Sequence, residues 1–451
     1  MQVKFFYNLS ILLFFAFSFS YAQAPDTAWT KTYGDSGYDG ANCIQQTVDG
    51  GYIIGGGGFA TLIKIDASGD LIWTKDYGLA ARSVQQTVDG GYIIACDGLT
   101  SLIKTDENGD SVWTRDYEIN PSCAYQTNDG GYIMAGSFVT GRDTHCCLLK
   151  TDLLGNAVWQ QTYVIGETGR ISSVQQTSDG GYIAAGLVHF PIGCWDYCLI
   201  KTDASGDSTW VKIHGAPGEP DEVYAVAQTD DGGYIMTGFY FWTVKTDEYG
   251  DTLWTRHYAI GEVGYAYSIR QTNDGGFLLA GFIDPPFEDQ GQLYIVKTDN
   301  YGNSMWEVEY GDRGREQCYD AIQTNDGGYM AAGYTGSFGA GNHDVWILKF
   351  ESETSVPEIV GFAPNDFALG NNYPNPFNSS TTIEFSLDKP QFVALTVYDL
   401  LGREINTLLE AEKPSGTHRI FFDASDLSSG VYFYRLQAGD LVASKRMILL
   451  K

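Results

Sequence analysis

The sequence predicts an all-β protein: a seven-bladed β-propeller followed by a small Ig-like antiparallel β-sandwich. The main observation is an Asp-Gly-Gly triplet after a Gln-Thr pair, which recurs in steps of 40 to 52 residues, the size of one propeller blade. The composition agrees, because 54 Gly, 30 Tyr and 24 Phe suit many short strands joined by tight turns. The triplets begin at Asp49, Asp89, Asp129, Asp179, Asp231, Asp274 and Asp326.

Each repeat divides into four strands, as the second one shows. Its apolar runs cover residues 83–87, 91–95, 101–105 and 111–117. Asp-Gly-Gly separates the first two runs and an Asp-x-x-Gly sequence separates the last two, and both supply residues that tolerate positive φ in hairpin turns. Four antiparallel strands make one blade.

The two ends of the repeat region complete each other. Residues 29–33 form a fourth strand with no blade before it, and residues 345–350 form a third strand with no fourth strand after it. Pairing of these segments would remove the two open edges that a linear stack exposes. We therefore expect the N-terminal strand to close the ring.

Residues that occur in every repeat are expected to build the scaffold. The fourth-strand tryptophans, such as Trp73, suit a buried wedge between blades, and the glutamine before each Thr, such as Gln86, suits a bond to blade backbone near the axis. A single ligand site instead needs residues that break the repeat, and the variable loops between strands two and three and between blades supply them. These loops bring carboxylates and arginines together with aromatics such as Tyr224 and Phe282, and the predicted ligand-binding residues are Phe190, Trp195, Asp196, Glu219, Asp221, Glu222, Asp284, Glu288, Asp289, Arg313 and Arg315.

These residue types suit carbohydrate or a protein surface, and they are also common in plain solvated loops. We predict a binding module, because the chain has no GxSxG, Walker, HExxH or paired CxxC motif. An enzyme, a polysaccharide hydrolase or lyase, is the alternative, with Asp221 and Asp320 as its carboxylate pair. A structural or adhesion protein is the third. No cofactor is identified, and calcium is left open without a specific motif.

The net charge limits the partners that the chain can bind. With 27 Lys and Arg against 56 Asp and Glu, the net charge is −29, which disfavours nucleic acid. The acidity belongs to residues 25–356, which hold 18 basic and 45 acidic residues.

Among the eight cysteines, Cys43 and Cys123 are expected to be buried thiols. A disulfide among four others stays open: Cys146, Cys147, Cys194 and Cys198.

The N-terminus predicts a signal peptide over residues 1–24. Lys4 precedes an apolar run from Phe5 to Phe17, and small residues then allow cleavage after Ala22 or Ala24. The run is shorter than the roughly 20 residues of a membrane-spanning helix, and no other candidate follows. We expect a mature chain without a transmembrane segment.

The last residues carry a more specific pattern. It comprises YPNPFN from Tyr373, VYDLLGRE from Val397, SGVYFYRL from Ser429 and a basic final strand. This segment resembles the C-terminal sorting domain of type IX secretion cargo (Por secretion system, type A), and the repeats resemble propeller repeats of secreted bacterial proteins. An ordinary Ig-like accessory domain, such as a hook-capping-type domain, is the alternative.

The resemblance implies passage through the periplasm, recognition by the outer-membrane secretion translocon, and release or attachment at the cell surface. The expected organisation is a signal peptide over 1–24, a propeller over 25–351, a linker over 352–366 and a sorting domain over 367–451.

Overall fold

The structure is a computed structural model, and all of its named elements are β-strands. It describes residues 24–97, 102–141, 143–190, 195–215, 221–259, 263–284, 291–311, 314–353, 368–373, 377, 379–387, 389–399, 403–428, 430–439 and 441–449. The predicted signal peptide lies outside these residues and stays a prediction.

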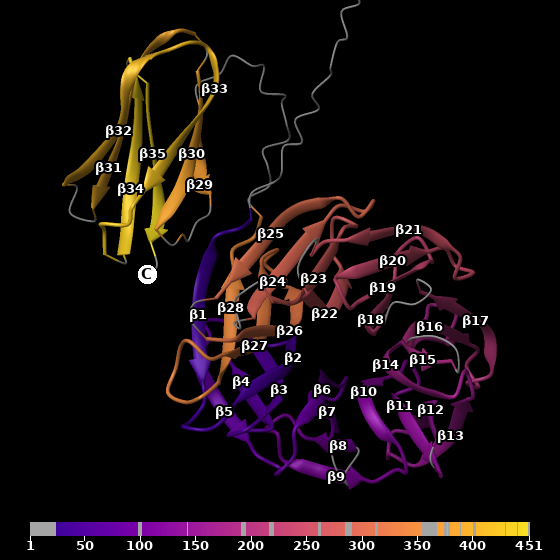
Figure 1. Cartoon of the computed structure of the whole chain (residues 1–451). Coiled ribbons are helices and arrows are strands. Elements are labelled where there is room, and N and C mark those ends of the chain that lie inside the picture. Colours follow the sequence, from indigo (N-terminus) through magenta and orange to yellow (C-terminus); the bar gives the residue numbers. More distant parts are fainter. Residues whose placement is uncertain are drawn as a thin grey trace, which may run out of the picture. The chain divides into compact units, whose positions relative to one another are not determined.

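Seven four-stranded sheets follow one another around a ring, with the first strand of each sheet nearest the axis (Figure 1). Blade 1 is β2 (Gly40–Gln46), β3 (Tyr52–Gly57), β4 (Leu62–Ile65) and β5 (Leu71–Lys75); blade 2 is β6 (Ala81–Gln86), β7 (Tyr92–Cys96), β8 (Leu102–Thr105) and β9 (Ser111–Arg115); blade 3 is β10 (Asn120–Gln126), β11 (Tyr132–Thr140), β12 (Asp143–Thr151) and β13 (Ala157–Tyr163); blade 4 is β14 (Thr168–Gln176), β15 (Tyr182–His189), β16 (Trp195–Thr202) and β17 (Ser208–His214).

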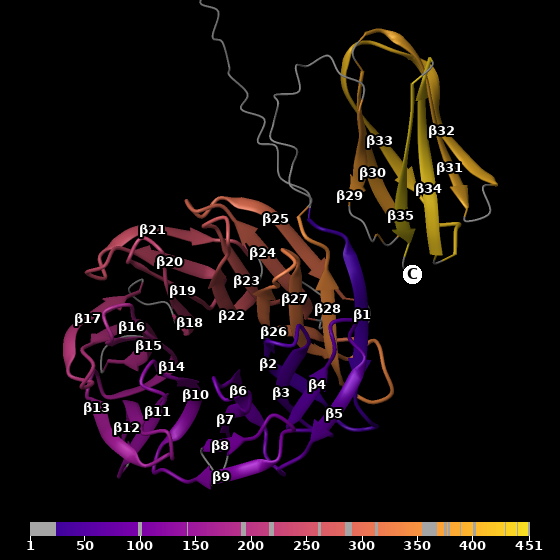
Figure 2. The same ribbon diagram turned by 180° about the vertical axis from the view of Figure 1, so that it is seen from behind.

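The remaining blades show how the ring closes (Figure 2). Blade 5 is β18 (Val223–Gln228), β19 (Tyr234–Gly238), β20 (Trp242–Thr246) and β21 (Thr252–His257); blade 6 is β22 (Val263–Gln271), β23 (Phe277–Asp284), β24 (Gln292–Thr298) and β25 (Ser304–Tyr310); blade 7 is β26 (Glu316–Gln323), β27 (Tyr329–Thr335), β28 (Asp344–Phe350) and β1 (Thr27–Tyr33). The last sheet has the order β1-β28-β27-β26, and the N–H of Glu351 donates to the carbonyl of Asp26 at 2.8 Å. The prediction of seven blades closed by the N-terminal strand is confirmed.

The recurrent tryptophans pack between blades, as predicted. Trp73 on β5 meets Tyr92 of the next blade edge to face, with ring centroids 5.9 Å apart. Its indole also covers Gly109, where φ is +77° and an added Cβ would lie 2.9 Å from the ring. That turn therefore needs glycine both for its backbone conformation and for the close approach of the tryptophan. The same contact recurs in the pairs Trp113–Tyr132, Trp159–Tyr182, Trp210–Tyr234 and Trp254–Phe277.

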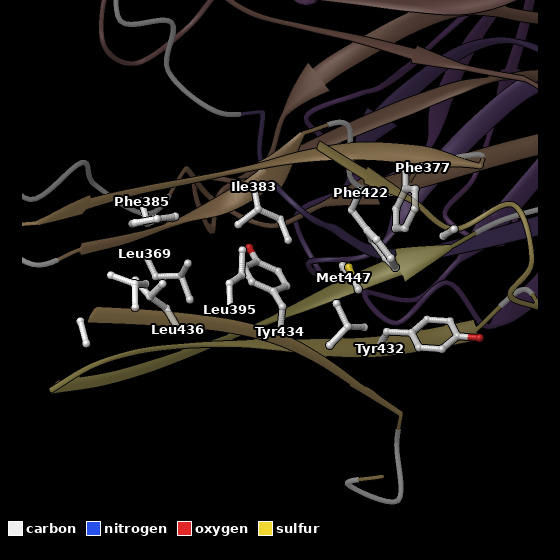
Figure 3. Close-up of a cluster of buried hydrophobic side chains, with 14 of the residues drawn as sticks. Leu369, Phe377, Ile383, Phe385, Leu395, Phe422, Tyr432, Tyr434, Leu436 and Met447 are labelled. Atoms are coloured by element: carbon white, nitrogen blue, oxygen red, sulfur yellow. The ribbon is translucent and has the colours of Figure 1, made fainter. Parts of the chain in front are cut away.

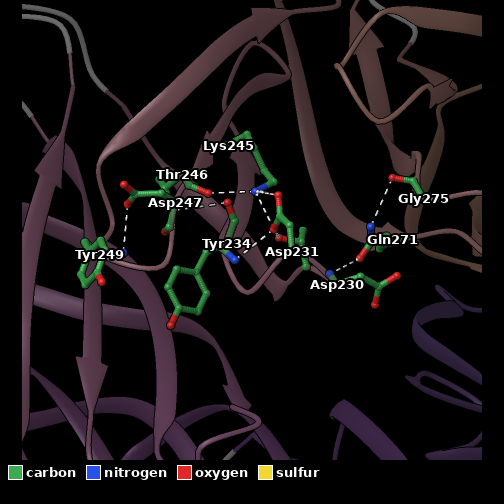
Figure 4. A network of polar contacts seen from close by, with 11 residues as sticks. Asp230, Asp231, Tyr234, Lys245, Thr246, Asp247, Tyr249, Gln271 and Gly275 are labelled. Carbon is green, nitrogen blue, oxygen red and sulfur yellow. Dashed lines mark hydrogen bonds and ion pairs between the residues drawn. The ribbon is translucent and has the colours of Figure 1, made fainter.

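A buried lysine in every blade pairs with the aspartate of the Asp-Gly-Gly turn. In blade 5, Lys245 Nζ lies 2.8 Å from Asp231 Oδ2 and also donates to the carbonyl of Thr246 (Figure 4). The lysine side chain is 4% exposed and the aspartate 59%. Each ion pair joins strand three to the turn between strands one and two. The other six, at 2.7–3.0 Å, are Lys64–Asp49, Lys104–Asp89, Lys150–Asp129, Lys201–Asp179, Lys297–Asp274 and Lys349–Asp326.

The repeated glutamines link neighbouring blades. Gln271 donates to the carbonyl of Gly275 in its own turn, and its Oε1 accepts the N–H of Asp230 from the preceding blade at 2.9 Å (Figure 4). The predicted bond to blade backbone is confirmed. Equivalent links run from Val48 to Gln86, Val88 to Gln126, Asn128 to Gln176 and Ser178 to Gln228.

The described cysteines are free thiols. Cys43 and Cys123 are buried, as predicted. Cys146, Cys147 and Cys198 are also buried and unpaired, so no bridge joins these three. Burial raises the pKa of the Cys146 thiol to about 12, which keeps it protonated. Cys194 lies outside the described residues, and a bridge to it stays a prediction.

The C-terminal part is a small sandwich of two antiparallel sheets, ordered β29-β30-β33 and β32-β31-β34-β35. Its strands are β29 (Ala368–Tyr373), β30 (Ser380–Leu387), β31 (Gln391–Asp399), β32 (Glu404–Lys413), β33 (Gly416–Asp423), β34 (Gly430–Ala438) and β35 (Leu441–Leu449). Ile383, Leu395, Phe422 and Tyr434 fill the space between the sheets (Figure 3). Alternate residues of β30, β31, β34 and β35 face this core, which is the period that a two-layer sheet requires.

The lysine–aspartate pairs predict how stability depends on pH. Partial burial acts to raise the pKa of Asp129, but bonds from Lys150 and Thr127 outweigh it and lower that pKa from the ordinary 3.8 to about 2. A lowered pKa in the folded state stabilises above the unfolded pKa, and this stabilisation is lost as the pH falls toward 2.

We expect Asp129→Asn to lower the free energy of unfolding by about 1–3 kcal/mol at pH 7, because Lys150 loses its counter-charge. The difference from wild type should shrink between pH 4 and pH 2, where wild-type Asp129 also becomes neutral. Urea denaturation at both ends of this range measures it. A difference that stays constant down to pH 2 would show that the pair does not act in this way.

Candidate functional site

The innermost strands share a β-bulge near their beginning. In β2, Ala41 and Cys43 pair with consecutive residues of β3, and Asn42 between them has no partner. A bulge of this kind bends the strand and redirects the side chain of the extra residue. It lies five residues before the Thr of each repeat, and the bulge residues of the following inner strands are Arg82, Ser122, Ser172, Tyr224 and Tyr267. The same repeat position in blade 7 is Tyr319.

Blades 5, 6 and 7 place tyrosines at this position, and these tyrosines touch. The rings of Tyr224 and Tyr267 meet edge to face with centroids 4.9 Å apart. The rings of Tyr267 and Tyr319 are stacked at 4.7 Å and 23°. All three side chains are partly buried. Three consecutive blades therefore present one continuous set of rings where the others present Asn, Arg and Ser.

The set extends along the ring toward blade 1 and is widened within blades 5 and 6. Toward blade 1, the rings of Tyr319 and Tyr334 have centroids 6.1 Å apart, and Tyr334 stacks on His343 at 4.4 Å and 11°. Tyr38, on the segment that enters blade 1, meets His343 edge to face at 5.0 Å. Within blades 5 and 6, Tyr265 stacks on Phe282 and contacts Phe239. We call this set the aromatic tract: Tyr38, Tyr224, Phe239, Tyr265, Tyr267, Phe282, Tyr319, Tyr334 and His343.

Charged groups surround the tract near Tyr265. The guanidinium of Arg315 lies 5.4 Å from the centroid of the Phe282 ring. Burial, followed by the carboxylates of Glu222 and Asp284, raises the pKa of Tyr265. Glu222 also accepts a 2.5 Å bond from the hydroxyl of Tyr224. The tract therefore combines apolar ring surface with both signs of charge, which allows it to orient a polar ligand.

The arginines in the described part of the propeller are concentrated at the axis. The ten lysines between residues 25 and 356 all form ion pairs with aspartates. Arg115 and Arg256 stack on tryptophans of the outer strands. The other described arginines lie on inner strands or directly before one, in an otherwise acidic ring: Arg82, Arg170, Arg270 and Arg315.

Arg270 and Asp320 form an ion pair that belongs to the scaffold. Asp320 accepts from Arg270 Nη2 at 3.0 Å, from Ser268 Oγ at 2.7 Å and from the backbone N–H of Ile44 in blade 1 at 3.1 Å. In blade 2 the equivalent residue, Ser83, likewise accepts a backbone N–H of the next blade, from Ala124 at 2.9 Å. The position of Asp320 is therefore explained by contact between blades.

The predicted site residues fall into two groups. Glu222, Asp284 and Arg315 belong to the first group, because their charges all act on the pKa of Tyr265 in the aromatic tract. The second group is on blade 4, where the ring centroids of Trp195 and His189 are 5.2 Å apart. The backbone carbonyl of Trp195 accepts the N–H of Asp221 at 2.7 Å.

The neighbours of Trp195 complete the second group. Burial raises the pKa of Asp196. The carboxylates of Asp196 and Asp221 both lie close to Gly215. Phe190 packs against a hydrophobic core cluster of blades 3 and 4. The remaining predicted residues lie outside the described part of the chain: Glu219, Glu288, Asp289 and Arg313.

Sequence reasoning had missed most of the tract. It concentrated on the long loops and named Tyr224 and Phe282, whereas Tyr267 and Tyr319 lie on strands. Aligning the repeats on their Thr would have shown that position −5 changes from small or polar residues to Tyr in three successive blades. In the described ranges, no group of three or more His, Cys, Asp or Glu side chains is arranged to hold a metal ion.

These features define the class: a seven-bladed β-propeller whose variable face carries one asymmetric aromatic surface. Residues 371–450 match the family of secretion system C-terminal sorting domains. The chain is a secreted β-propeller protein with a type IX sorting domain, which directs it to the cell surface or the extracellular space. Across the described residues, no helix is long and apolar enough to cross a membrane.

The structure explains the residues of the sorting motif. Phe377 of the NPF sequence is buried in the sandwich core. In the VYD-x-x-GR sequence, Asp399 accepts the backbone N–H of Arg403 at 2.9 Å and its Nε at 2.6 Å. Residues 430–436 of the SGVYFYRL sequence lie in β34, which pairs with both β31 and β35.

The chain is similar to several solved structures at low sequence identity. A protein of unknown function from Bacteroides caccae is 14% identical, with 57% of this chain and 93% of that one covered and a TM-score of 0.42. PorZ, described as an essential surface component of the type-IX secretion system of Porphyromonas gingivalis, is 12% identical (94% and 58% covered, TM-score 0.43). YCF48 from Cyanidioschyzon merolae is also 12% identical (72% and 99%, TM-score 0.48). No curated protein matches the sequence.

The Arg270–Asp320 pair can be tested against the residues of the other repeats. Arg270→Gln and Asp320→Ser restore residues that other blades carry at these positions, such as Gln85 and Ser83. We expect each single change to lower the free energy of unfolding by about 2 kcal/mol, because it leaves a charge unpaired. The double variant should lose less than either single variant. Urea denaturation of the four proteins measures this, and losses that simply add would argue against the pair.

Proposed function

We propose that the propeller is a carbohydrate-binding module and that its ligand lies on the aromatic tract. The observation that carries the proposal is the break in the repeat at the bulge position. The tryptophans, glutamines and lysines of the scaffold recur from blade to blade, whereas Tyr224, Tyr267 and Tyr319 occur only in three adjacent blades and contact one another. A group that differs between blades is what one asymmetric ligand requires.

The physical properties of these side chains support a sugar ligand. A tyrosine offers a flat apolar ring for the C–H face of a sugar and a hydroxyl for its polar edge. The stacked neighbours hold each ring in place, so little side-chain freedom is lost on binding. Arg315, Glu222 and Asp284 supply donors and acceptors around the rings, as ligand sites generally do.

The blade 4 group would extend this surface. Trp195 is partly exposed and lies beside Asp196 and Asp221. Asp221 directly precedes Glu222, which is 3.9 Å from Arg170 and bonded to Tyr224. We infer that a long glycan reaching beyond Tyr224 meets the blade 4 residues next.

The contacts of Asp320 favour a binding function over glycoside hydrolysis. A glycosidase needs two carboxylates free to act on either side of the scissile bond. Asp320 is 9% exposed and accepts bonds from an arginine, a serine and a backbone N–H. The alternative carboxylate pair of Asp221 and Asp320 would therefore require a scaffold contact to break.

Export is the second half of the proposal. We infer that the outer-membrane translocon recognises the C-terminal sandwich and that residues 1–24 direct the chain to the periplasm. The propeller would then meet glycans outside the cell or on its surface, where its many acidic side chains keep it soluble.

The proposal predicts that Tyr267→Ala weakens glycan binding at least tenfold, because the central ring of the tract is lost. Tyr267→Phe should retain most of the affinity, since it keeps the ring. Tyr249→Ala is the matched control, because Tyr249 is 63% exposed at the tip of a hairpin in the same propeller and lies outside the tract. An array of defined polysaccharides identifies a bound glycan, and calorimetry then gives the dissociation constants.

Thermal unfolding of each variant separates loss of the site from loss of the fold. Equal affinity of Tyr267→Ala and wild type would contradict the proposal. So would wild-type protein that binds no glycan on the array.

A further inference from the structure

The aromatic tract ends in a small hollow between blades 7, 1 and 2. Its volume is about 250 Å³, and its lining includes Tyr38, Asn42, Tyr334 and His343. Typical pockets for drug-sized ligands have volumes of roughly 300–1,000 Å³. The hollow therefore has room for one ring-sized unit of a longer ligand.

Small residues at one repeat position create the hollow. Seven residues before the repeat Thr, blades 1 and 2 carry Gly40 and Ala80, and both line the hollow. The other blades carry larger side chains at this position: Asn120, Arg170, Glu222, Tyr265 and Gln317. The blades therefore differ at this position as well. Two of them carry small residues here, directly beside the tyrosines that occur in three other blades at the bulge position.

The polar groups around the hollow are uncharged or already paired. Asn42 donates through Nδ2 to the carbonyl of Ala81 at 2.8 Å, which directs its amide. Asp39 also lines the hollow, but its carboxylate accepts the N–H groups of Asp35 and Phe59 at 2.8 and 2.7 Å. Burial, followed by Arg315, lowers the pKa of His343, so its imidazole is neutral at pH 7. An amide, an imidazole and two phenols remain to meet a ligand.

The hollow lies at one end of the tract. Tyr334 joins it to Tyr319, with ring centroids 6.1 Å apart, and Ala80 of blade 2 bounds it on the side away from the tract. Beyond Ala80 the next inner strand carries Arg82, which is paired with Asp97 at 2.6 Å. A chain that runs along the tyrosines toward blade 1 therefore meets the end of the aromatic surface here.

We propose that this hollow is a terminal subsite, which holds a single uncharged sugar at the end of a glycan while the following units lie over Tyr319 and Tyr267. The inference rests on the proposed function and adds two properties to it: the protein binds glycan ends, and the terminal unit is neutral.

Gly40 allows a direct test. An added Cβ would lie 3.7 Å from Tyr334, an ordinary contact, so position 40 accepts a side chain. Tyr249→Leu, at the exposed hairpin tip outside the tract, is the control. Gly40→Leu fills the hollow. The probes are five neutral hexasaccharides (cello-, malto-, xylo-, laminari- and mannohexaose) and two acidic ones (hexagalacturonate and hexaguluronate). Calorimetry with the full chain gives the dissociation constants, and thermal unfolding confirms that each variant is folded.

We expect wild type and Tyr249→Leu to bind at least one neutral hexasaccharide with similar affinity, and Gly40→Leu to bind it at least tenfold more weakly. Methylation of the non-reducing end or reduction of the other end of that hexasaccharide should cause a similar loss for the wild type. Asn42→Ala should weaken binding as well, because it removes a polar group of the hollow.

Each other outcome is informative. If Gly40→Leu binds as wild type does while Tyr267→Ala does not bind, the tract binds chain interiors; the terminal subsite is then wrong and the proposed function stands. Binding of acidic hexasaccharides alone overturns the neutral subsite. If no probe binds to the wild type, or if Tyr267→Ala leaves binding unchanged, both the subsite and the proposed function are contradicted.

Discussion

The pairing of β1 with β28 is the constraint on which the rest of the propeller depends. Six blades are built from consecutive strands, whereas the seventh takes its outer strand from the other end of the repeat region. A row of blades would expose two apolar faces and two strand edges, and closure removes them together. The closing segment also leads into the candidate site, since Tyr38 follows β1 and the N–H of Asp39 donates to the carbonyl of His343 at 2.9 Å. The segment that closes the ring therefore also borders the hollow at the end of the tract.

Within the closed ring, repeated contacts account for the repeated residues. A tryptophan fills the gap to the next blade, a glutamine accepts a backbone N–H from the turn of the preceding blade, and a buried lysine holds the Asp-Gly-Gly turn against strand three. Because these residues are used by the scaffold, function is expected at the positions where repeats differ. The bulge creates one such position, since in blades 1 to 6 it turns an inner-strand side chain out of the normal alternation.

The fold could be predicted from the sequence because its determinants recur with the period of a blade. The spacing of Trp73 and its equivalents gave the number of blades, and the incomplete strands at both ends indicated closure. The lysine–aspartate pairs were not foreseen, although both residues recur, because their contact depends on how strand three is placed against the first turn. For example, Lys104 meets Asp89 across 15 residues of sequence.

The site could be predicted only in part. The long variable loops pointed to Glu222, Asp284 and Arg315, whose charges act on Tyr265 of the tract; their role in binding stays a prediction. Tyr267 and Tyr319 were missed because alternation along a strand does not show which residue is the bulge; that depends on pairing with the neighbouring strand. Tyr334 and His343 meet only after the chain folds back between β27 and β28. Contacts of this kind depend on the register between paired strands, and the repeat period of the sequence does not determine that register.

Hydrogen exchange of the β1 amides tests ring closure most directly. If β1 is an integral strand of blade 7, the β1 amides that bond to β28 should exchange as slowly as those of β28, with the same dependence on denaturant, because both open only when the blade unfolds. Fast exchange of β1 at low denaturant, while β28 stays protected, would show that the N-terminal strand does not close the ring.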